Sequence, residues 1–391
     1  MPQHPLRALA CALSAALVSA ALALPAVTPA AAAIAAGWSI LPSPNAGTSS
    51  TANLLDAVSC PVPGICMAVG SYSSGDRTKN LAEHWNGTRW SLLPIPDPAG
   101  DGDFLSGLSC PGNTSCTAVG GGETASGGGS TRPLAEHWNG HTWSIQPTPA
   151  GPGALSSLDS VSCVSEAFCV AVGTAGPQGD QALIEAWNGH AWSVVPAHTG
   201  HAVATLLSVS CVSTADCVAV GSWGSSVKKT LAERWDGTAW SVEPSPNAGP
   251  SGTSNALVGV YCVNASRCRA IGGELTGPGT LYALGEVWNG GKWSIVKTPA
   301  TPEDPYAVSC QAISSCVATG ADATGQSLIM HWNGQAWSVV ASPHHPGTQS
   351  ELDDVSCRAA GCIAVGNYYA SNDVNRTLTE SSYPGASTPA S

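Results

Sequence analysis

Carboxylates recur at the same position of a repeated sequence segment in this chain. Such side chains commonly serve as general acids and bases. The position is held by Glu83, Glu136, Glu185, Glu233, Glu286 and Glu380, with Met330 as the one exception in the series. A catalytic centre brings unlike residues to one point, whereas these are identical copies spread along the chain. We therefore expect buried structural acceptors, for an indole N–H or a turn amide, and assign no catalytic residue.

Four aspartates form a second candidate centre, for a cation. Asp56, Asp159, Asp353 and Asp354 lie just before repeated V-S-C segments, which we assign below to innermost strands close to the mouth of a central channel. Carboxylate oxygens so placed could hold calcium, which takes oxygen ligands. Solvated acids are the alternative, and no other metal or organic cofactor is indicated.

Other catalytic constellations are absent or incomplete. The motifs G-x-S-x-G and H-E-x-x-H and the P-loop do not occur. A sialidase-like centre needs clustered arginines, an acid and a tyrosine nucleophile. Arg77, Arg132, Arg376 and Tyr368 are the nearest match, but the arginines precede third strands, away from the channel.

Aromatic and basic residues recur beside the same loops and suit a sugar, because rings stack on pyranose faces while polar donors bind hydroxyls. Two residues after a C-x-A-V-G glycine stand Tyr72, Trp223 and Tyr368. Two residues before the following leucine stand Lys79, Arg132, Lys229 and Arg376. Scattered surface residues are the alternative. The loop histidines His198, His201, His344 and His345 have no recurring partner, and we interpret them as ordinary surface residues.

Fourteen of the fifteen cysteines form closely spaced pairs, C-x5-C in six copies and C-x4-C in the last. Facing residues of a short antiparallel hairpin lie within disulfide range. The predicted disulfides are Cys60–Cys66, Cys110–Cys116, Cys163–Cys169, Cys211–Cys217, Cys262–Cys268, Cys310–Cys316 and Cys357–Cys362. Zinc is the alternative, but the spacing is not C-x2-C and no histidine recurs beside the pairs, so no metal is assigned.

The cysteine pairs mark a repeat of about fifty residues, a period typical of propellers and arrays. Each copy holds strand-sized apolar runs bounded by turn residues, such as L-S-V-S-C, C-V-A-V-G, L-A-E-R-W and W-S-V-E-P around Cys211. No helical periodicity is sustained. Four antiparallel strands per copy are typical of a propeller blade.

The two ends of the repeat region complement each other. The opening segment WSILPSPNAG nearly duplicates WSVEPSPNAG at 240–249, while the last copy lacks a W-S-x-x-P strand. Adding the first segment to the last copy hides both open sheet edges. We therefore predict an all-β, seven-bladed propeller of four-stranded antiparallel blades over residues 37–383, closed by its N-terminal strand.

The motif W-N-G-x-x-W joins the third and fourth strands of six copies. Asn-Gly between strands predicts a two-residue type I′ turn, which would place Trp85 opposite Thr88 and Glu83 opposite Trp90. The tryptophans are expected to pack between blades. These turns and the cysteine turns then share one face of the ring, and longer, more variable loops, such as 71–80, share the other with the connections between blades.

Residues 1–32 have the pattern of a secretory signal peptide, with cleavage sites among residues 30–36. We expect a secreted, extracellular protein that does not insert in a membrane after cleavage, with a disordered tail at 384–391. The net charge of -12 and the 10% charged residues argue against nucleic acid and anionic membranes as partners. A monomer is expected.

The repeat V-S-C-x5-C-x-A-V-G … L-A-E-H-W-N-G-x-x-W-S-x-x-P-S-P resembles that of secreted actinobacterial β-propeller repeat proteins, mostly uncharacterised, over Trp38 to Tyr383. The W-N-G-x-x-W hairpin alone is similar to those of tectonin-type and fungal fucose-lectin-type propellers, which lack the paired cysteines. The resemblance implies a fold and no activity. We expect a non-enzymatic binding propeller that recognises a glycan or an extracellular protein through the long-loop face. An extracellular glycan-active hydrolase with its site at the central channel, and a structural cell-surface protein, are the alternatives.

Overall fold

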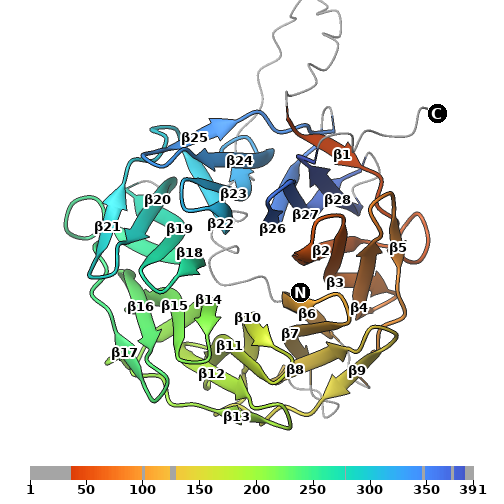
Figure 1. Ribbon diagram of the computed structural model, residues 1–391, viewed down its shortest axis with the longest axis horizontal. Coiled ribbons are helices and arrows are strands. Elements are labelled where there is room, and N and C mark those ends of the chain that lie inside the picture. Colours follow the sequence, from red (N-terminus) through yellow and green to blue (C-terminus); the bar gives the residue numbers. More distant parts are fainter. Residues whose placement is uncertain are drawn as a thin grey trace, which may run out of the picture. The chain divides into compact units, whose positions relative to one another are not determined.

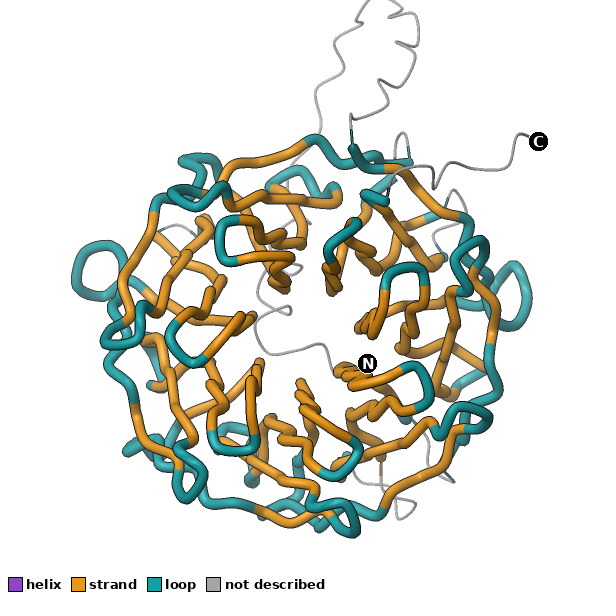
Figure 2. The backbone as a smooth tube through the Cα atoms, viewed as in Figure 1, coloured by secondary structure: helices purple, strands orange, loops and turns teal. Residues whose placement is uncertain are grey.

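The strands of the chain form seven separate four-stranded antiparallel sheets. The computed structural model describes residues 37–98, 102–123, 129–277, 279–345, 348–370 and 374–383, and within these ranges it contains strands β1 to β28 and no helix. The sheets stand around a central axis as the blades of a propeller (Figures 1 and 2). The predicted seven-bladed fold is therefore confirmed.

Six of the blades run outward from the axis in chain order, and in the seventh the N-terminal strand β1 is outermost. The innermost strands are β2 (Asn53–Val62), β6 (Phe104–Gly112), β10 (Ser157–Ser165), β14 (Ala204–Ser213), β18 (Ser254–Asn264), β22 (Glu303–Ala312) and β26 (Ser350–Arg358). The second strands are β3 (Ile65–Ser74), β7 (Ser115–Glu123), β11 (Phe168–Ala175), β15 (Asp216–Trp223), β19 (Arg267–Thr276), β23 (Ser315–Asp322) and β27 (Gly361–Tyr369). We number the blades 1 to 7 in this order.

The outer half of each blade is shorter. The third strands are β4 (Arg77–Trp85), β8 (Thr131–Trp138), β12 (Gln181–Trp187), β16 (Lys229–Trp235), β20 (Thr280–Trp288), β24 (Ser327–Trp332) and β28 (Asn375–Ser381). The outermost strands are β5 (Trp90–Leu92), β9 (Trp143–Gln146), β13 (Trp192–Val194), β17 (Trp240–Val242), β21 (Trp293–Val296), β25 (Trp337–Val340) and β1 (Ser39–Leu41).

Blade 7 is completed by the N-terminal strand, as predicted. Strand β1 pairs antiparallel with β28, with Ser39 opposite Ser381 and Leu41 opposite Thr379 (Figure 1). The Thr379 hydroxyl also donates to the Leu41 carbonyl oxygen at 3.0 Å. The outer edge of β28 is thus covered by residues from the other end of the repeat region, which closes the ring.

Side-chain to backbone hydrogen bonds join the innermost strands of neighbouring blades. The serine before the first cysteine of one blade accepts from the N–H of the first cysteine of the next, at 2.9–3.0 Å. The pairs are Ser356 to Cys60, Ser59 to Cys110, Ser109 to Cys163, Ser162 to Cys211, Ser210 to Cys262 and Ser309 to Cys357. These bonds explain why V-S-C recurs.

Strand geometry makes this contact available. The Cα atoms of Cys60 and Cys66 are 4.0 Å apart, close to the spacing of a non-hydrogen-bonded antiparallel pair. The N–H of Cys60 therefore points away from β3, toward blade 7. In blade 5 the serine is replaced by Tyr261, and there Arg269 donates to the Ile313 carbonyl oxygen of blade 6 at 3.0 Å.

The glycine of C-x-A-V-G is required by a bulge in the innermost strand. In blade 1 the bulge lies between Leu55 and Ala57, and Gly70 pairs with Leu55. A Cβ atom on Gly70 would lie 2.2 Å from the Leu54 carbonyl oxygen, which is far inside van der Waals contact. Every blade has a glycine at this register position, because the bulge brings the two backbones too close for a side chain.

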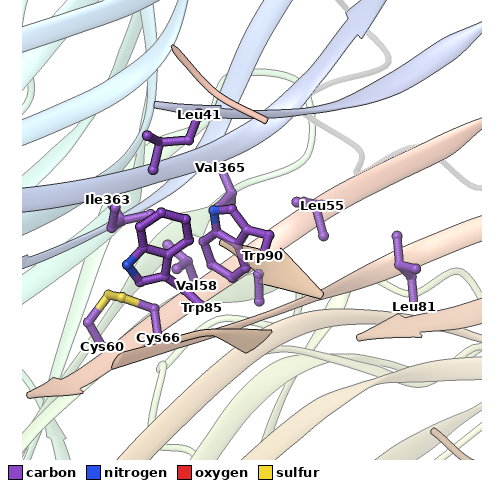
Figure 3. Close-up of a cluster of buried hydrophobic side chains, with 11 residues drawn as sticks. Leu41, Leu55, Val58, Cys60, Cys66, Leu81, Trp85, Trp90, Ile363 and Val365 are labelled. Atoms are coloured by element: carbon purple, nitrogen blue, oxygen red, sulfur yellow. A yellow bond between two sulfur atoms is a disulfide. The ribbon is translucent and has the colours of Figure 1, made fainter. Parts of the chain in front are cut away.

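The core consists of clusters between neighbouring blades. In the cluster of Figure 3, Trp85 and Trp90 of blade 1 lie beside the Cys60–Cys66 disulfide, together with Ile363 and Val365 of β27. All seven predicted disulfides form, with S–S lengths of 2.03–2.09 Å. The tryptophans therefore pack blade against blade, as expected.

The W-N-G-x-x-W hairpin differs from the prediction. Trp85 lies opposite Trp90 and Glu83 opposite Leu92, so the loop has four residues instead of two. The Asn86 Oδ1 atom accepts from the N–H groups of Thr88 and Arg89, both at 3.0 Å, and Gly87 has φ of +93°. The amide cap stabilises the longer loop. Glu83 and both tryptophans still share one face, because residues two apart do so on a strand.

Substitution of Ser309 by alanine tests the bonds between innermost strands. It leaves the buried N–H of Cys357 without its acceptor, so we expect the free energy of unfolding to fall by roughly 1–3 kcal/mol. Guanidinium denaturation with the disulfides intact measures the change. Ser338→Ala, at an exposed position on β25, is the matched control, and an equal loss in both variants contradicts the assigned role.

Candidate functional site

The long-loop face is the face formed by the connections between second and third strands and by the connections between blades. The predicted loop at 71–80 on this face is mostly paired. Strands β3 and β4 continue to Ser74 and Arg77, which leaves only Gly75 and Asp76 as the turn. Pairing satisfies backbone groups that a loop would have to leave to water. It also fixes which side chains face one another.

This pairing brings the predicted aromatic and basic residues together in three blades. Tyr72 lies directly opposite Lys79 in blade 1. The same register places Trp223 opposite Lys229 in blade 4 and Tyr368 opposite Arg376 in blade 7. Arg132 differs, since it is exposed and pairs with Gly122.

The basic side chains of these pairs contact the connection that leaves their own blade. Lys79 forms an ion pair of 2.9 Å with Asp97, and this hydrogen bond raises the pKa of Lys79. Lys229 donates to the Thr253 carbonyl oxygen at 3.3 Å. Arg376 donates to carbonyl oxygens of the connection before β2, namely those of Thr48, Ser49 and Thr51. Each cation therefore holds a connecting segment, and direct contact with a ligand stays a prediction.

Two of the loop histidines stack on the aromatic residues, a contact that their interpretation as ordinary surface residues did not include, although His201 is exposed. The His201 and Trp223 ring centroids are 3.7 Å apart with 2° between the planes. His345 and Tyr368 are 4.0 Å apart with 24° between the planes. Both histidines come from the connection that enters the blade. Sequence patterns missed these contacts because the histidine stands at a different place in each of the two connections.

A hollow of about 400 Å³ lies against the third aromatic residue, Tyr72. One side is the connection that enters blade 1, and the other is the end of β3 with its turn. The lining residues are Gly47, Thr48, Ser50, Thr51, Tyr72, Ser73, Ser74 and Gly75. The hollow thus combines one ring with five hydroxyl-bearing side chains and has no charged residue in its lining.

The four aspartates are not brought into one site. Asp56, Asp159 and Asp353 occupy the bulges of β2, β10 and β26. Asp354 accepts from the Val58 N–H of blade 1 at 2.8 Å and from its neighbour Val355 at 2.8 Å, so it joins two blades. Among the residues that the structure describes, no three histidine, cysteine or acidic side chains are grouped so as to hold a metal ion.

The six recurring glutamates are fully buried between blades. Their acceptor role follows from hydroxyl donors: Ser43 donates to Glu83 at 2.8 Å, Ser245 to Glu286 at 3.0 and 3.1 Å, and Ser342 to Glu380 at 2.9 and 3.1 Å. Each of these serines follows the outermost strand of the preceding blade.

The other glutamates have different neighbours. Asn80 donates to Glu136 at 2.8 Å, and the His198 backbone N–H donates to Glu233 at 3.2 Å. Both carboxyl oxygens of Glu185 lack a hydrogen-bond partner among the described residues. The expected indole donors do not reach the glutamates in the described residues: the Trp187 indole, for example, donates to the Glu166 carbonyl oxygen at 3.0 Å, and that of Trp90 has no partner.

Burial determines the charge of these groups. Desolvation raises the pKa of Glu83, Glu136, Glu185, Glu286 and Glu380 to about 8 and also raises that of Glu233. At neutral pH the carboxyls with pKa about 8 are therefore mostly protonated. Enclosed between blades, they can accept and donate hydrogen bonds, and they are not exposed to solvent.

Comparison with known proteins supports the fold and leaves the activity open. No protein-family model matches the chain, and no curated protein matches it. Among solved structures, YCF48 bound to D1 peptide is similar with a TM-score of 0.55 and 14% identity, over 92% of this chain and 99% of that one. The WD40 β-propeller domain of Doa1 is similar with a TM-score of 0.53 and 12% identity, over 88% of this chain and 97% of that one.

A glycan-active enzyme is also among the similar structures. The GH74 xyloglucanase from Xanthomonas campestris gives a TM-score of 0.53 and 11% identity, over 87% of this chain and 55% of that one. The chain folds as a β-propeller. At these identities the likeness shows the fold alone, so neither peptide binding nor hydrolysis is carried over from it.

The predicted signal peptide (1–32), its cleavage region and the predicted tail (384–391) lie outside the described residues, so these expectations stay predictions. Within the described part of the chain, none of the secondary structure is a helix of the length and hydropathy needed to span a bilayer.

Replacing Glu185 by methionine tests the state of the buried carboxyls. A folded pKa of about 8 against 4.5 unfolded means that the folded state holds a proton that the unfolded state releases between these values. The contribution of this bound proton to the free energy of unfolding is therefore fully present below about pH 4.5 and is lost as pH rises through 8. The loss is up to about 1.4 kcal/mol per pH unit for each group. Met330, at the equivalent place in blade 6, shows that an apolar side chain fits.

We expect Glu185→Met to raise the free energy of unfolding at pH 8 and to make its decline from pH 5 to pH 8 less steep. Denaturant titrations at several pH values measure both effects. Glu243→Met, which alters a carboxylate outside the buried series, is the control. An unchanged slope in Glu185→Met would show that Glu185 is ionised in the folded protein.

Proposed function

We propose that the protein is a secreted, non-enzymatic binding propeller that recognises a glycan through its long-loop face. The observation that carries the proposal is the hollow against Tyr72. An aromatic ring supplies a flat apolar surface for the C–H face of a sugar, and hydroxyl groups around it match the hydroxyls of a saccharide. Ligand sites commonly combine an aromatic or apolar surface with a few placed polar groups in this way.

The lining also indicates the charge of the glycan. None of its residues is acidic or basic, and the nearby cations Lys79 and Arg376 are engaged by Asp97 and by backbone carbonyl oxygens. A neutral saccharide therefore fits better than a sulfated or sialylated one, whose charge would have no partner there.

Secretion is consistent with the seven disulfides, since such bonds persist in oxidising compartments and are rare in the cytosol. The signal peptide expected at residues 1–32 would direct the export of the protein. An extracellular protein partner, in place of a glycan, is the neighbouring hypothesis for the same face.

A glycan-active hydrolase is the second candidate, and it would use the aspartates of the innermost strands. Glycoside hydrolysis needs two carboxyl groups flanking one bond. Asp353 and Asp354 are adjacent in β26, but Asp354 already accepts two backbone N–H groups. Polysaccharide hydrolysis that disappears in Asp353→Ala would establish the enzyme instead.

A glycan array at neutral pH, with and without calcium, tests the proposed function. We expect binding to neutral glycans that does not depend on calcium. Tyr72→Ala should weaken it about tenfold or more, the factor that corresponds to a loss of about 1.4 kcal/mol. Tyr369→Ala removes an exposed tyrosine of blade 7 outside the hollow and is the matched control. No array signal, together with a protein partner recovered by pull-down, would overturn the glycan proposal.

A further inference from the structure

Tyr72, Trp223 and Tyr368 occupy equivalent positions in blades 1, 4 and 7. Each follows by two residues the glycine that faces the bulge, and each lies opposite a basic residue on the third strand. Because the blades share one register, the three rings have the same relation to the connection that enters their blade. The residues of that connection then determine which group, if any, stacks on each ring.

In blades 4 and 7 the connection places an imidazole on the ring, His201 on Trp223 and His345 on Tyr368. In blade 1 the corresponding connection contributes Gly47, Thr48, Ser50 and Thr51, and the hollow lies between them and Tyr72. No aromatic ring contacts Tyr72 among the residues with described positions. The hollow of blade 1 therefore lies between the entering connection and the aromatic residue, the two elements that in blades 4 and 7 are joined by a histidine stack.

We infer that the three aromatic rings are equivalent stacking platforms, that His201 and His345 close two of them from within the chain, and that the Tyr72 platform is open to an external saccharide ring. This inference rests on the proposed glycan-binding function. It makes that function more specific, because it predicts one binding site per chain for a neutral saccharide, at the Tyr72 ring.

The internal stacks indicate what a platform accepts. The His201 imidazole lies nearly parallel to Trp223, so a flat ring can seat on the aromatic face without displacing the strand. A pyranose offers a comparable face with hydroxyls at its edge. In the hollow, the Ser73 hydroxyl accepts from the Ala52 N–H at 2.9 Å and keeps its own hydrogen to donate. Thr48 and Ser50 hydroxyls lie 2.9 Å apart and form a second polar edge.

Closure by a histidine excludes weak ligands. A group held on the same chain acts at an effective concentration of about the millimolar range or higher, whereas an external monosaccharide must reach that concentration in solution. The His201 backbone is held independently of its ring, because its N–H donates to the Thr199 hydroxyl at 3.2 Å and its carbonyl oxygen accepts from that hydroxyl at 3.0 Å. Removing the imidazole should therefore open the platform and leave the connection in place.

His201→Ala in the full chain is the test, with His190→Ala, an exposed histidine in the β12–β13 turn, as the control. Hydroxyl-radical footprinting measures closure without any ligand. We expect Trp223 labelling to rise several-fold in His201→Ala and to stay unchanged in His190→Ala. Unchanged Trp223 labelling in His201→Ala would contradict the inference that His201 covers the Trp223 ring.

Saturation-transfer NMR with the methyl glycosides of glucose, galactose, mannose and fucose measures binding. We expect about a twofold gain in transfer for His201→Ala, because the platforms are distant and independent, and loss of the wild-type signal in Tyr72→Ala. Wild-type transfer that survives in Tyr72→Ala overturns the inference. No transfer in the wild type, with increased Trp223 labelling in His201→Ala, supports histidine closure and overturns the glycan function.

Discussion

Each four-stranded blade must bury apolar residues on both of its faces, and it can do so only between two other blades. The cluster that contains Trp85 and Trp90 shows this dependence, since it includes Ile363 and Val365 from the far end of the chain. An open row of blades would expose such a surface at each end. The pairing of β1 with β28 is therefore the contact on which the ring depends, because it makes the first and last repeats parts of adjacent complete blades.

Polar contacts between blades add specificity to this apolar packing. The serine to cysteine bonds align the innermost strands, and three of the buried glutamates, Glu83, Glu286 and Glu380, accept from serine hydroxyls of the preceding blade. The junction of blades 5 and 6 departs from both patterns, because Tyr261 replaces the serine in blade 5 and Met330 replaces the glutamate in blade 6. Arg269 supplies the contact there, through the Ile313 carbonyl oxygen and over the Trp332 ring at 4.9 Å. One junction of the ring is thus held by different chemistry.

The two faces of the ring differ because of what the hairpins must do. Cysteine turns and asparagine-capped loops repeat nearly unchanged on one face, where each is constrained by a disulfide or an amide cap. On the long-loop face the hairpins vary in length, and the entering connections vary in sequence. The equivalent aromatic ring therefore stacks on an imidazole in blade 4 and borders a hydroxyl-lined hollow in blade 1. Repetition supplies the platform, and variation in one connection determines access to it.

The sequence alone determined the strand order, the seven disulfides and the closure by residues 38–47, because periodic cysteines, turn residues and an unmatched end strand are local signals. It also identified Tyr72, Trp223 and Tyr368 as related positions. Tertiary structure decided the rest. The stacking of His201 and His345, the anchoring by Arg376 and the donors to the buried glutamates are contacts between blades or connections. The sequence does not show which of these groups meet, because the contacts depend on the paths of the connections and on the closure of the ring, which only the tertiary structure decides.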